Sequence, residues 1–337
     1  MKTTSDELPP LAAPSCCAYE RNPREQTVPK NEARSAGRPQ RFFWPGRNLV
    51  WFSCGAASAV AAKLAVDKYG ANGCEILYCD LANEHPDNDR FLADVEKWLG
   101  VTVKRLRSDE FPSMDIYDVF AKHGYIAGIG GARCTRALKR EIRMAYAADE
   151  DNHIFGFTSD EAGRIADFEK NNPALYCEWL LASEGITKKD CYRIIQAAGI
   201  RLPAMYLLGF KNNNCICCVK GGAGYHNKCR RHFPEESARM ARVSREMGVK
   251  LVKYKGERIF LDELPPDAGN YQDEPDFECG PQCVMPSDRE EVFDGKLPVA
   301  GRVGSAERRA GHRDASSAQG GASGHNTQGQ ESPTKTN

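Results

Sequence analysis

The sequence has no excess of charge of either sign, no long hydrophobic run and no internal repeat. Its 46 Lys and Arg residues balance 46 Asp and Glu residues, which argues against a broadly basic surface for nucleic acid. No stretch reaches the length that crosses a bilayer. The N-terminus also lacks a basic start followed by an apolar run, the pattern of a secretory signal. We therefore expect a cytoplasmic protein that does not associate with a membrane.

Both ends of the chain are poor in large apolar residues. Residues 1–45 are rich in Pro, Arg, Asn and Ser, and residues 287–337 consist largely of Gly, Ser, Gln, Arg and Thr. Segments of this composition bury too little surface to offset the entropy of the ordered chain. We predict disordered tails at 1–45 and 287–337, and one domain over 46–286.

The core alternates short apolar segments with amphipathic ones. The pattern predicts strands at 49–53, 75–79, 101–106 and 153–157, and helices at 57–69, 86–99, 115–123, 134–146 and 161–171. This alternation predicts an α/β fold with a parallel, doubly wound sheet covered on both faces. The second half is more helical, with helices predicted at 188–198 and 234–247, and it carries closely spaced cysteines. We therefore expect a helical, cysteine-bearing C-terminal part.

A loop of small residues joins the first predicted strand to the first helix. It consists of Ser53, Cys54, Gly55, Ala56, Ala57 and Ser58. Small side chains let backbone N–H groups approach a phosphate, and the helix N-terminus adds the positive end of its dipole. The loop is neither a Walker A motif nor a Gly-x-Gly-x-x-Gly motif. Two interpretations therefore stay open, a nucleotide phosphate site and close packing of a helix on a sheet.

Two further groups follow predicted strands. Asp80 comes directly after the strand at 75–79, and a turn follows Phe157. Ligands of parallel sheets bind beyond the carboxyl ends of the strands. The common position of Asp80, this turn and the small-residue loop favours a ligand site at that edge.

The chain has 14 cysteines, which in a cytoplasmic protein of this size do not suggest a disulfide framework. Cys215 and Cys218 have the spacing of a metal or cluster knuckle, and Cys279 and Cys283 form a second close pair. Cys134 begins a basic helix, where the helix N-terminus and neighbouring arginines favour a thiolate.

Three uses of these cysteines stay open. The two close pairs suit a structural zinc site. Cys134, Cys215 and Cys218 with one of the last pair suit an iron–sulfur cluster, because soft thiolates bind either metal. A redox dithiol is the third possibility. Two locally basic segments, 133–143 and 228–232, are read as solvated helix faces or as a local basic path.

Four motifs together resemble one family. Ser53, Gly55 and Ser58 match a loop of the form Ser-Gly-Gly-x-x-Ser, in which Cys54 replaces the first Gly and Ala57 stands where Asp often occurs. The other three motifs are Gly156-Phe157 with Glu161 and Arg164, Arg133-Cys134-Thr135 with Lys139, and Cys215-x-x-Cys218-x-Lys220-Gly221. From about residue 49 to 283 the chain resembles the phosphoadenosine phosphosulfate reductase family of the PP-loop (adenine nucleotide alpha hydrolase-like) group, in its phage or prophage form.

The resemblance implies an enzyme of the host cytoplasm that cleaves ATP, with Mg²⁺, to AMP and pyrophosphate and couples the adenylation to sulfur transfer or reduction. It implies nucleotide contacts from residues 53–58, Asp80, Gly156 and Glu161. It implies catalytic roles for Lys139, Arg164 and Cys283. A [4Fe–4S] cluster is implied on Cys134, Cys215, Cys218 and Cys283, with Cys279 as the alternative fourth ligand and zinc as the alternative metal.

The resemblance also implies partners, namely a sulfur donor or thioredoxin-like reductant and a nucleic-acid acceptor. Two other functions stay open. One is reduction of adenylyl or phosphoadenylyl sulfate to sulfite. The other is a non-catalytic nucleotide- or DNA-binding phage protein with a structural zinc knuckle.

Overall fold

A computed structural model describes residues 46–128, 131–277 and 279–280 of the chain. The chain divides into two units, Met1–Asp288 and Arg289–Asn337, and every described residue belongs to the first. The predicted tails and Cys283 lie outside the described residues. Within the described residues, no helix is both long enough and apolar enough to cross a membrane.

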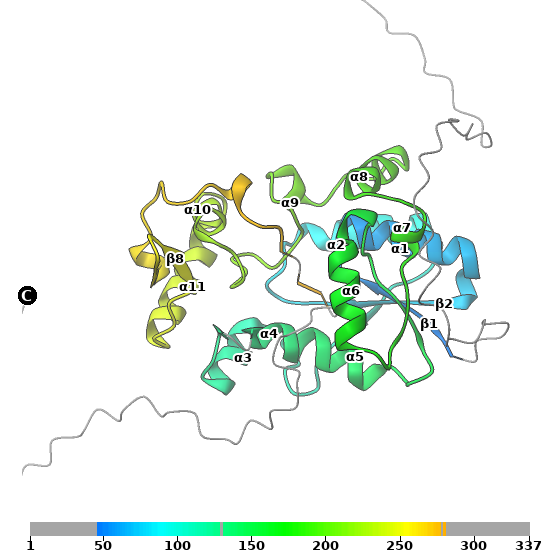
Figure 1. The fold of residues 1–337 in the computed structure, drawn as a ribbon, viewed down its shortest axis with the longest axis horizontal. Coiled ribbons are helices and arrows are strands. Elements are labelled where there is room, and N and C mark those ends of the chain that lie inside the picture. Colours follow the sequence, from blue (N-terminus) through cyan, green and yellow to red (C-terminus); the bar gives the residue numbers. More distant parts are fainter. Residues whose placement is uncertain (1–45, 129–130, 278, 281–337) are drawn as a thin grey trace, which may run out of the picture. The chain divides into compact units, whose positions relative to one another are not determined.

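The core is a five-stranded parallel sheet in the order β3-β2-β1-β6-β7 (Figure 1). Its strands are β1 (Asn48–Phe52), β2 (Cys74–Cys79), β3 (Lys104–Leu106), β6 (Asn152–Ile154) and β7 (Tyr176–Glu178). The chain runs outward from β1 to β3 and then returns to the other side of β1. This order confirms the predicted doubly wound sheet, and it puts the topological switch point between β1 and β6.

Alternate residues of β1 enter two separate cores, as a strand buried on both faces requires. Val50 and Phe52 pack with α1 (Ala56–Tyr69), α2 (Asp87–Leu99), α7 (Leu180–Ser183) and α8 (Lys188–Ala197). Leu49 and Trp51 pack with α3 (Ile116–His123), α5 (Glu141–Tyr146) and α6 (Ala162–Asn171), in a cluster that extends into the C-terminal part.

The helix predicted at 134–146 is interrupted. It consists of α4 (Arg133–Thr135), a π-helical turn over Arg136–Arg140, and α5. Ala137, Leu138 and Lys139 are all buried in this wider turn. Periodicity does not reveal such a turn, because a single extra residue barely changes the apolar pattern, and π-turns of this kind are frequent at functional sites.

The C-terminal part contains α9 (Ala204–Leu207), α10 (Ala223–His232), α11 (Pro234–Glu246) and a hairpin of β8 (Val252–Tyr254) with β9 (Glu257–Ile259). Thr187 caps α8, because its side chain accepts a hydrogen bond from the N–H of Asp190. The sequence patterns did not predict α10, β7 or the short hairpin of β4 (Ala127–Gly128) with β5 (Gly131–Ala132).

Candidate functional site

The small-residue loop lies between the carboxyl end of β1 and the N-terminus of α1. Gly55 is the N-cap of α1, and no side chain caps the helix there. Cys54 has a φ of 53°, in the left-handed region that glycine adopts most easily. The glycine of the family pattern is therefore replaced by cysteine at a position whose backbone still has the conformation that favours glycine. The Cys54 side chain is fully buried.

The Ser58 hydroxyl holds the loop closed. It donates to the carbonyl of Gly55 at 3.0 Å and accepts from the backbone N–H of Ser53 at 3.1 Å. The Ser53 hydroxyl lies 3.1 Å from the same oxygen. Both serines also line the pockets beside the loop, Ser53 in both pockets and Ser58 in one.

Gly156 packs against this loop from across the switch point. A Cβ atom at Gly156 would lie 2.7 Å from the backbone nitrogen of Ser58 and 2.8 Å from its Cα. Backbone atoms cannot yield at such distances as a flexible side chain can. Only glycine therefore allows the segment after β6 to approach the start of α1, and the predicted nucleotide contact of Gly156 stays a prediction.

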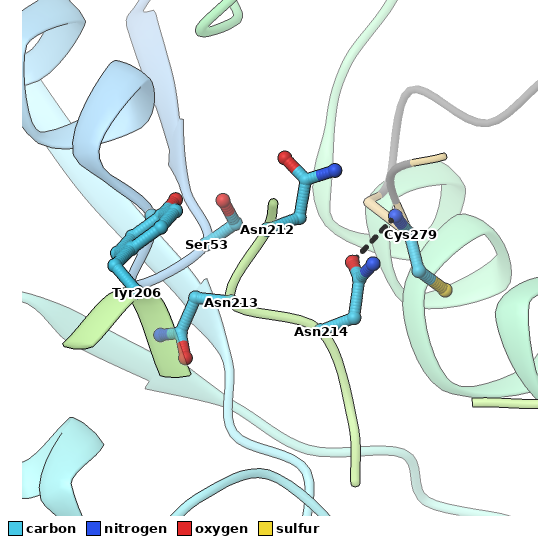
Figure 2. A pocket seen from close by; sticks show the side chains of 7 residues that line it. Ser53, Tyr206, Asn212, Asn213, Asn214 and Cys279 are labelled. Carbon is cyan, nitrogen blue, oxygen red and sulfur yellow. Dashed lines mark hydrogen bonds between the residues drawn. The ribbon is translucent and has the colours of Figure 1, made fainter. Parts of the chain in front are cut away.

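Two adjoining pockets at this edge share Ser53, Gly55 and Tyr206. Figure 2 shows the pocket that the three asparagines and Cys279 also line. On one side the lining continues with Trp51, Ala57, Ser58 and Gly156, and on the other with Asn212, Asn213, Asn214 and Cys279. Tyr206 divides them. Its hydroxyl accepts the N–H of Ala56 at 3.3 Å, at the first turn of α1. We call the two pockets together the cleft.

Three predicted site residues do not line the cleft. Asp80 follows β2 as predicted, but its carboxylate pairs with Arg105 at 2.9 Å and with Arg107 at 3.4 Å. Glu161 and Arg164 form an ion pair with each other at the start of α6. Their charges are compensated by neighbours, and sequence spacing alone could not show this.

Lys139 is also absent from the cleft lining, because it is buried beneath it. The side chain donates to Glu84 at 3.1 Å and to the carbonyl of Cys279 at 2.7 Å. Burial by itself lowers the pKa of Lys139, but Glu84 and the thiols of Cys279 and Cys215 raise it well above its ordinary value. Lys139 therefore places a buried positive charge beside Glu84 and the backbone of Cys279, and its predicted catalytic role stays a prediction.

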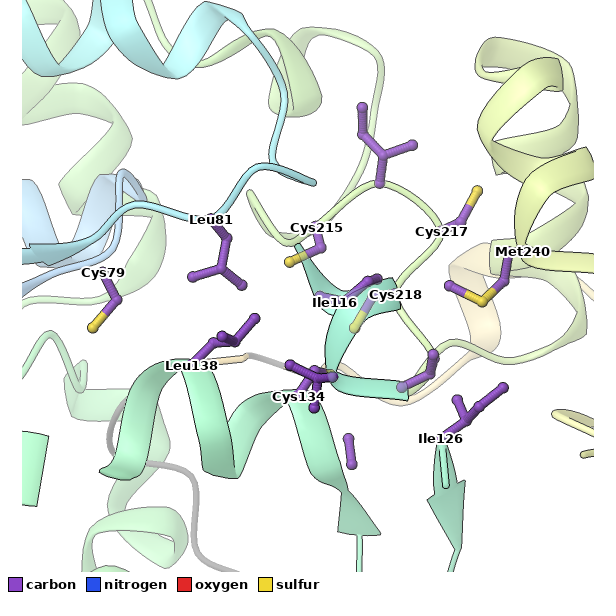
Figure 3. Close-up of a cluster of buried hydrophobic side chains, with 14 of the residues drawn as sticks. Cys79, Leu81, Ile116, Ile126, Cys134, Leu138, Cys215, Cys217, Cys218 and Met240 are labelled. Atoms are coloured by element: carbon purple, nitrogen blue, oxygen red, sulfur yellow. The ribbon is translucent and has the colours of Figure 1, made fainter. Parts of the chain in front are cut away.

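Cys134, Cys215, Cys218 and Cys279 meet in the core between α4 and the loop after α9. Figure 3 shows the first three among apolar side chains. The Cys279 thiol forms a hydrogen bond with that of Cys218 and lies 3.1 Å from the Thr135 hydroxyl. Burial and the nearby Cys279 raise the pKa of Cys134 to about 12, while Lys220 and Lys139 act to lower it. The thiols of Cys134, Cys215 and Cys218 belong to one buried cluster, the Cys279 thiol lies beside Cys218, and their predicted role as metal ligands stays a prediction.

The Cys215–Cys218 knuckle is held by Tyr225 of α10. The Tyr225 hydroxyl donates to the carbonyl of Cys215 at 3.0 Å and accepts the N–H of Cys218 at 3.1 Å. A Cβ atom on Gly221 would lie 2.0 Å from the Tyr225 ring. The glycine after the knuckle therefore makes room for this ring. The Cys217 side chain points away from those of Cys134, Cys215 and Cys218 (Figure 3). It is hydrogen-bonded to Cys229 instead.

As the side chains stand, no three His, Cys, Asp or Glu residues in the described part of the chain are arranged to hold a metal ion. Soft thiols such as these four suit a soft metal or an iron–sulfur cluster. Lys139 and Lys220 act to lower the pKa values of the thiols, but burial and neighbouring thiols keep those of Cys134, Cys215 and Cys218 above their ordinary values. Cys283, predicted as a ligand and as a catalytic thiol, lies outside the described residues.

A chain of buried polar groups joins the loop to the cysteines. The Asn213 amide donates to the carbonyl of Cys54 at 2.8 Å and to the Asn88 side chain at 2.7 Å. Asn88 donates to Glu84 at 3.0 Å, and Glu84 pairs with Lys139. The two predicted halves of the site therefore share one hydrogen-bonded support.

Several residues of this site were missed in the sequence, among them Glu84, Asn88, Tyr206, Asn213 and Tyr225. The only signal was the run of three asparagines before Cys215, because consecutive polar residues next to a buried knuckle need partners. All three are buried, and all three line the cleft. The functional importance of the others comes from contacts between segments far apart in the sequence.

Comparison of the sequence with known protein families and curated proteins gives no match that bears on this site. No protein-family model matches the chain, and no curated protein matches it.

Proposed function

We propose that the protein is a nucleotide-binding enzyme of the PP-loop type. In this proposal it cleaves ATP between the α and β phosphates, adenylates an acceptor and couples that step to sulfur transfer or reduction. The observation that carries the proposal is the position of Cys279, which lines the cleft beside the loop and also belongs to the four-thiol cluster. Nucleotide chemistry and thiol chemistry would thus share one cleft.

The loop provides the phosphate contacts in this proposal. The N-cap residue Gly55 supplies no side-chain cap, and the Tyr206 hydroxyl bound to the Ala56 N–H would give way to a phosphate oxygen where the helix dipole favours an anion. The lining residues include no carboxylate. Mg²⁺ would therefore arrive with the triphosphate, as it commonly does when substrate phosphates supply its ligands.

The proposed reaction uses two nucleophiles, one after the other. An acceptor oxygen attacks the α phosphate, the bond between the α and β phosphates breaks, and pyrophosphate leaves. A sulfur nucleophile then displaces AMP from the adenylated acceptor, whose oxygen leaves with AMP. Cys134, Cys215, Cys218 and Cys279 would hold a [4Fe–4S] cluster, which would supply electrons to this chemistry. Lys139 would balance the negative charge of these thiolates.

The first test is metal content. We expect anaerobically purified full-length protein to contain iron and acid-labile sulfide and to absorb in the visible blue. Substitution of Cys279 by Ser should remove most of both, whereas Cys217→Ala, which changes a buried thiol that points away, should retain them. Stoichiometric zinc in a colourless protein would contradict the cluster, and unchanged iron in Cys279→Ser would contradict the ligand set.

The second test is nucleotide chemistry. Calorimetry should detect ATP binding, and pyrophosphate should appear when the correct acceptor is present. If the protein bound no ATP and released no pyrophosphate under anaerobic conditions, the proposal would be wrong. Sulfite made from phosphoadenylyl sulfate with thioredoxin would indicate the reductase alternative. Tight ATP binding that Ser58→Ala leaves unchanged, without turnover, would indicate a non-catalytic protein.

A further inference from the structure

A second polar pocket lies between α10 and the segment at 266–272. Its lining includes Lys228 and Arg231 of α10, with Asp267, Asn270, Tyr271 and Gln272 opposite. The basic run at 228–232 therefore does not simply face solvent. Two of its cations line a concave surface that the proposed nucleotide chemistry does not use.

The two cations have no acidic partner among the residues that the structure describes. Burial and repulsion from Arg231 lower the pKa of Lys228. Arg230, by contrast, donates to the carbonyls of Leu261 and Leu264 and so holds the fold together. An anion bound between Lys228 and Arg231 would remove their repulsion.

Aromatic rings hold the Lys228 ammonium in place. Its nitrogen lies 5.0 Å from the ring centroid of Phe210 and 5.5 Å from that of Tyr271. Such contacts orient an ammonium group without neutralising its charge. The pocket therefore keeps a fixed positive charge available to a ligand.

The pocket adjoins the cleft through one short segment. The Lys228 nitrogen would lie 3.0 Å from a Cβ atom on Gly209, three residues after Tyr206 of the cleft. The Tyr271 hydroxyl accepts the N–H of Lys211 at 2.7 Å, and the chain continues directly into Asn212 and Asn213 of the cleft. A ligand in this pocket is therefore a near neighbour of the nucleotide.

We propose that this pocket binds a phosphate ester, with the phosphate between Lys228 and Arg231. The Asp267 carboxylate and the Asn270 and Gln272 amides favour a ligand that carries hydrogen-bond donors beside its phosphate, as a nucleotide unit does. Inorganic phosphate lacks this organic part, so it offers the pocket no donor apart from the phosphate hydroxyl itself. The assignment of this ligand to the acceptor rests on the proposed function, but binding of the phosphate ester does not.

The test measures binding of a fluorescent single-stranded oligonucleotide to the full-length protein by anisotropy, with AMP and inorganic phosphate as competitors. The double variant Lys228→Gln/Arg231→Gln should weaken binding about tenfold and reduce the slope of log affinity against log salt by about 1.4. The matched control Arg242→Gln/Lys253→Gln removes the same charge from exposed positions on α11 and β8 and should change affinity less than twofold.

The outcomes separate the possibilities. Loss confined to the Lys228/Arg231 variant supports the site, and displacement of the oligonucleotide by AMP but not by inorganic phosphate supports a nucleotide ligand. Equal losses in both variants, or none in either, overturn it. Circular dichroism confirms that the variants fold. ATP binding in the cleft, measured by calorimetry on the same variants, should stay unchanged, so a failure of the proposed function is seen separately.

Discussion

The two sides of the cleft are built in different ways. On the loop side, Gly156 and residues 53–58 meet through backbone atoms, and the Ser58 hydroxyl bonds to neighbouring backbone. On the cysteine side, the knuckle depends on a side chain, the Tyr225 hydroxyl. The loop side can therefore be predicted from neighbouring residues in the sequence. The cysteine side depends on contacts between residues whose spacing in the sequence does not reveal them.

The sharpest way to break the loop side is Gly156→Ala. The added methyl group meets the Ser58 backbone at 2.7 Å, and we expect a loss of about 3 kcal/mol in unfolding free energy. ATP affinity, measured by calorimetry, should fall at least tenfold because the start of α1 must move. The matched control is Gly163→Ala in α6, where the methyl group meets nothing within 4 Å. A Gly156→Ala protein that binds ATP normally would contradict the packing argument.

Tyr225→Phe tests the cysteine side. It leaves the carbonyl of Cys215 and the N–H of Cys218 without their buried partner, at a cost of about 2 kcal/mol in unfolding free energy. Iron content after reconstitution should fall while ATP affinity stays within twofold of the wild type. Tyr254→Phe in the outer hairpin is the control. Equal loss of iron and ATP binding would show that the two sides are not independent.

Tyr206→Phe should change ATP affinity least of the three substitutions. It tests the residue that lines both pockets of the cleft. The Tyr206 hydroxyl occupies the Ala56 N–H at the start of α1, where we expect a phosphate oxygen. Its removal should tighten ATP binding by about 1 kcal/mol, or about fivefold, as measured by calorimetry. Weaker binding would mean that the hydroxyl contacts the nucleotide and does not compete with it.

The sheet and the loop side could be predicted because their signals are local. Apolar runs end at Phe52 and Cys79, and small residues follow the first of them. The strand β7 was missed because Tyr176, Cys177 and Glu178 do not form an apolar run, since this strand lies at the sheet edge and is only partly buried.

The cysteine side could be predicted only in part. Spacing identified Cys215 and Cys218, and the start of a basic helix identified Cys134, but nothing in the sequence shows that Glu84 neutralises Lys139. Asp80 shows the opposite case, because its position after β2 was correct while Arg105 and Arg107 compensate its charge. Ion pairs between distant segments therefore set the limit of the sequence prediction.

The buried pair of Glu84 and Lys139 has a consequence for how the chain can vary. Loss of one partner leaves an uncompensated charge in the core, which costs about 3–5 kcal/mol, whereas exchange of both for apolar residues does not. Related sequences that keep this fold should therefore conserve both positions or replace both together. A mutational survey of the two codons should find each single change harmful and some double changes tolerated.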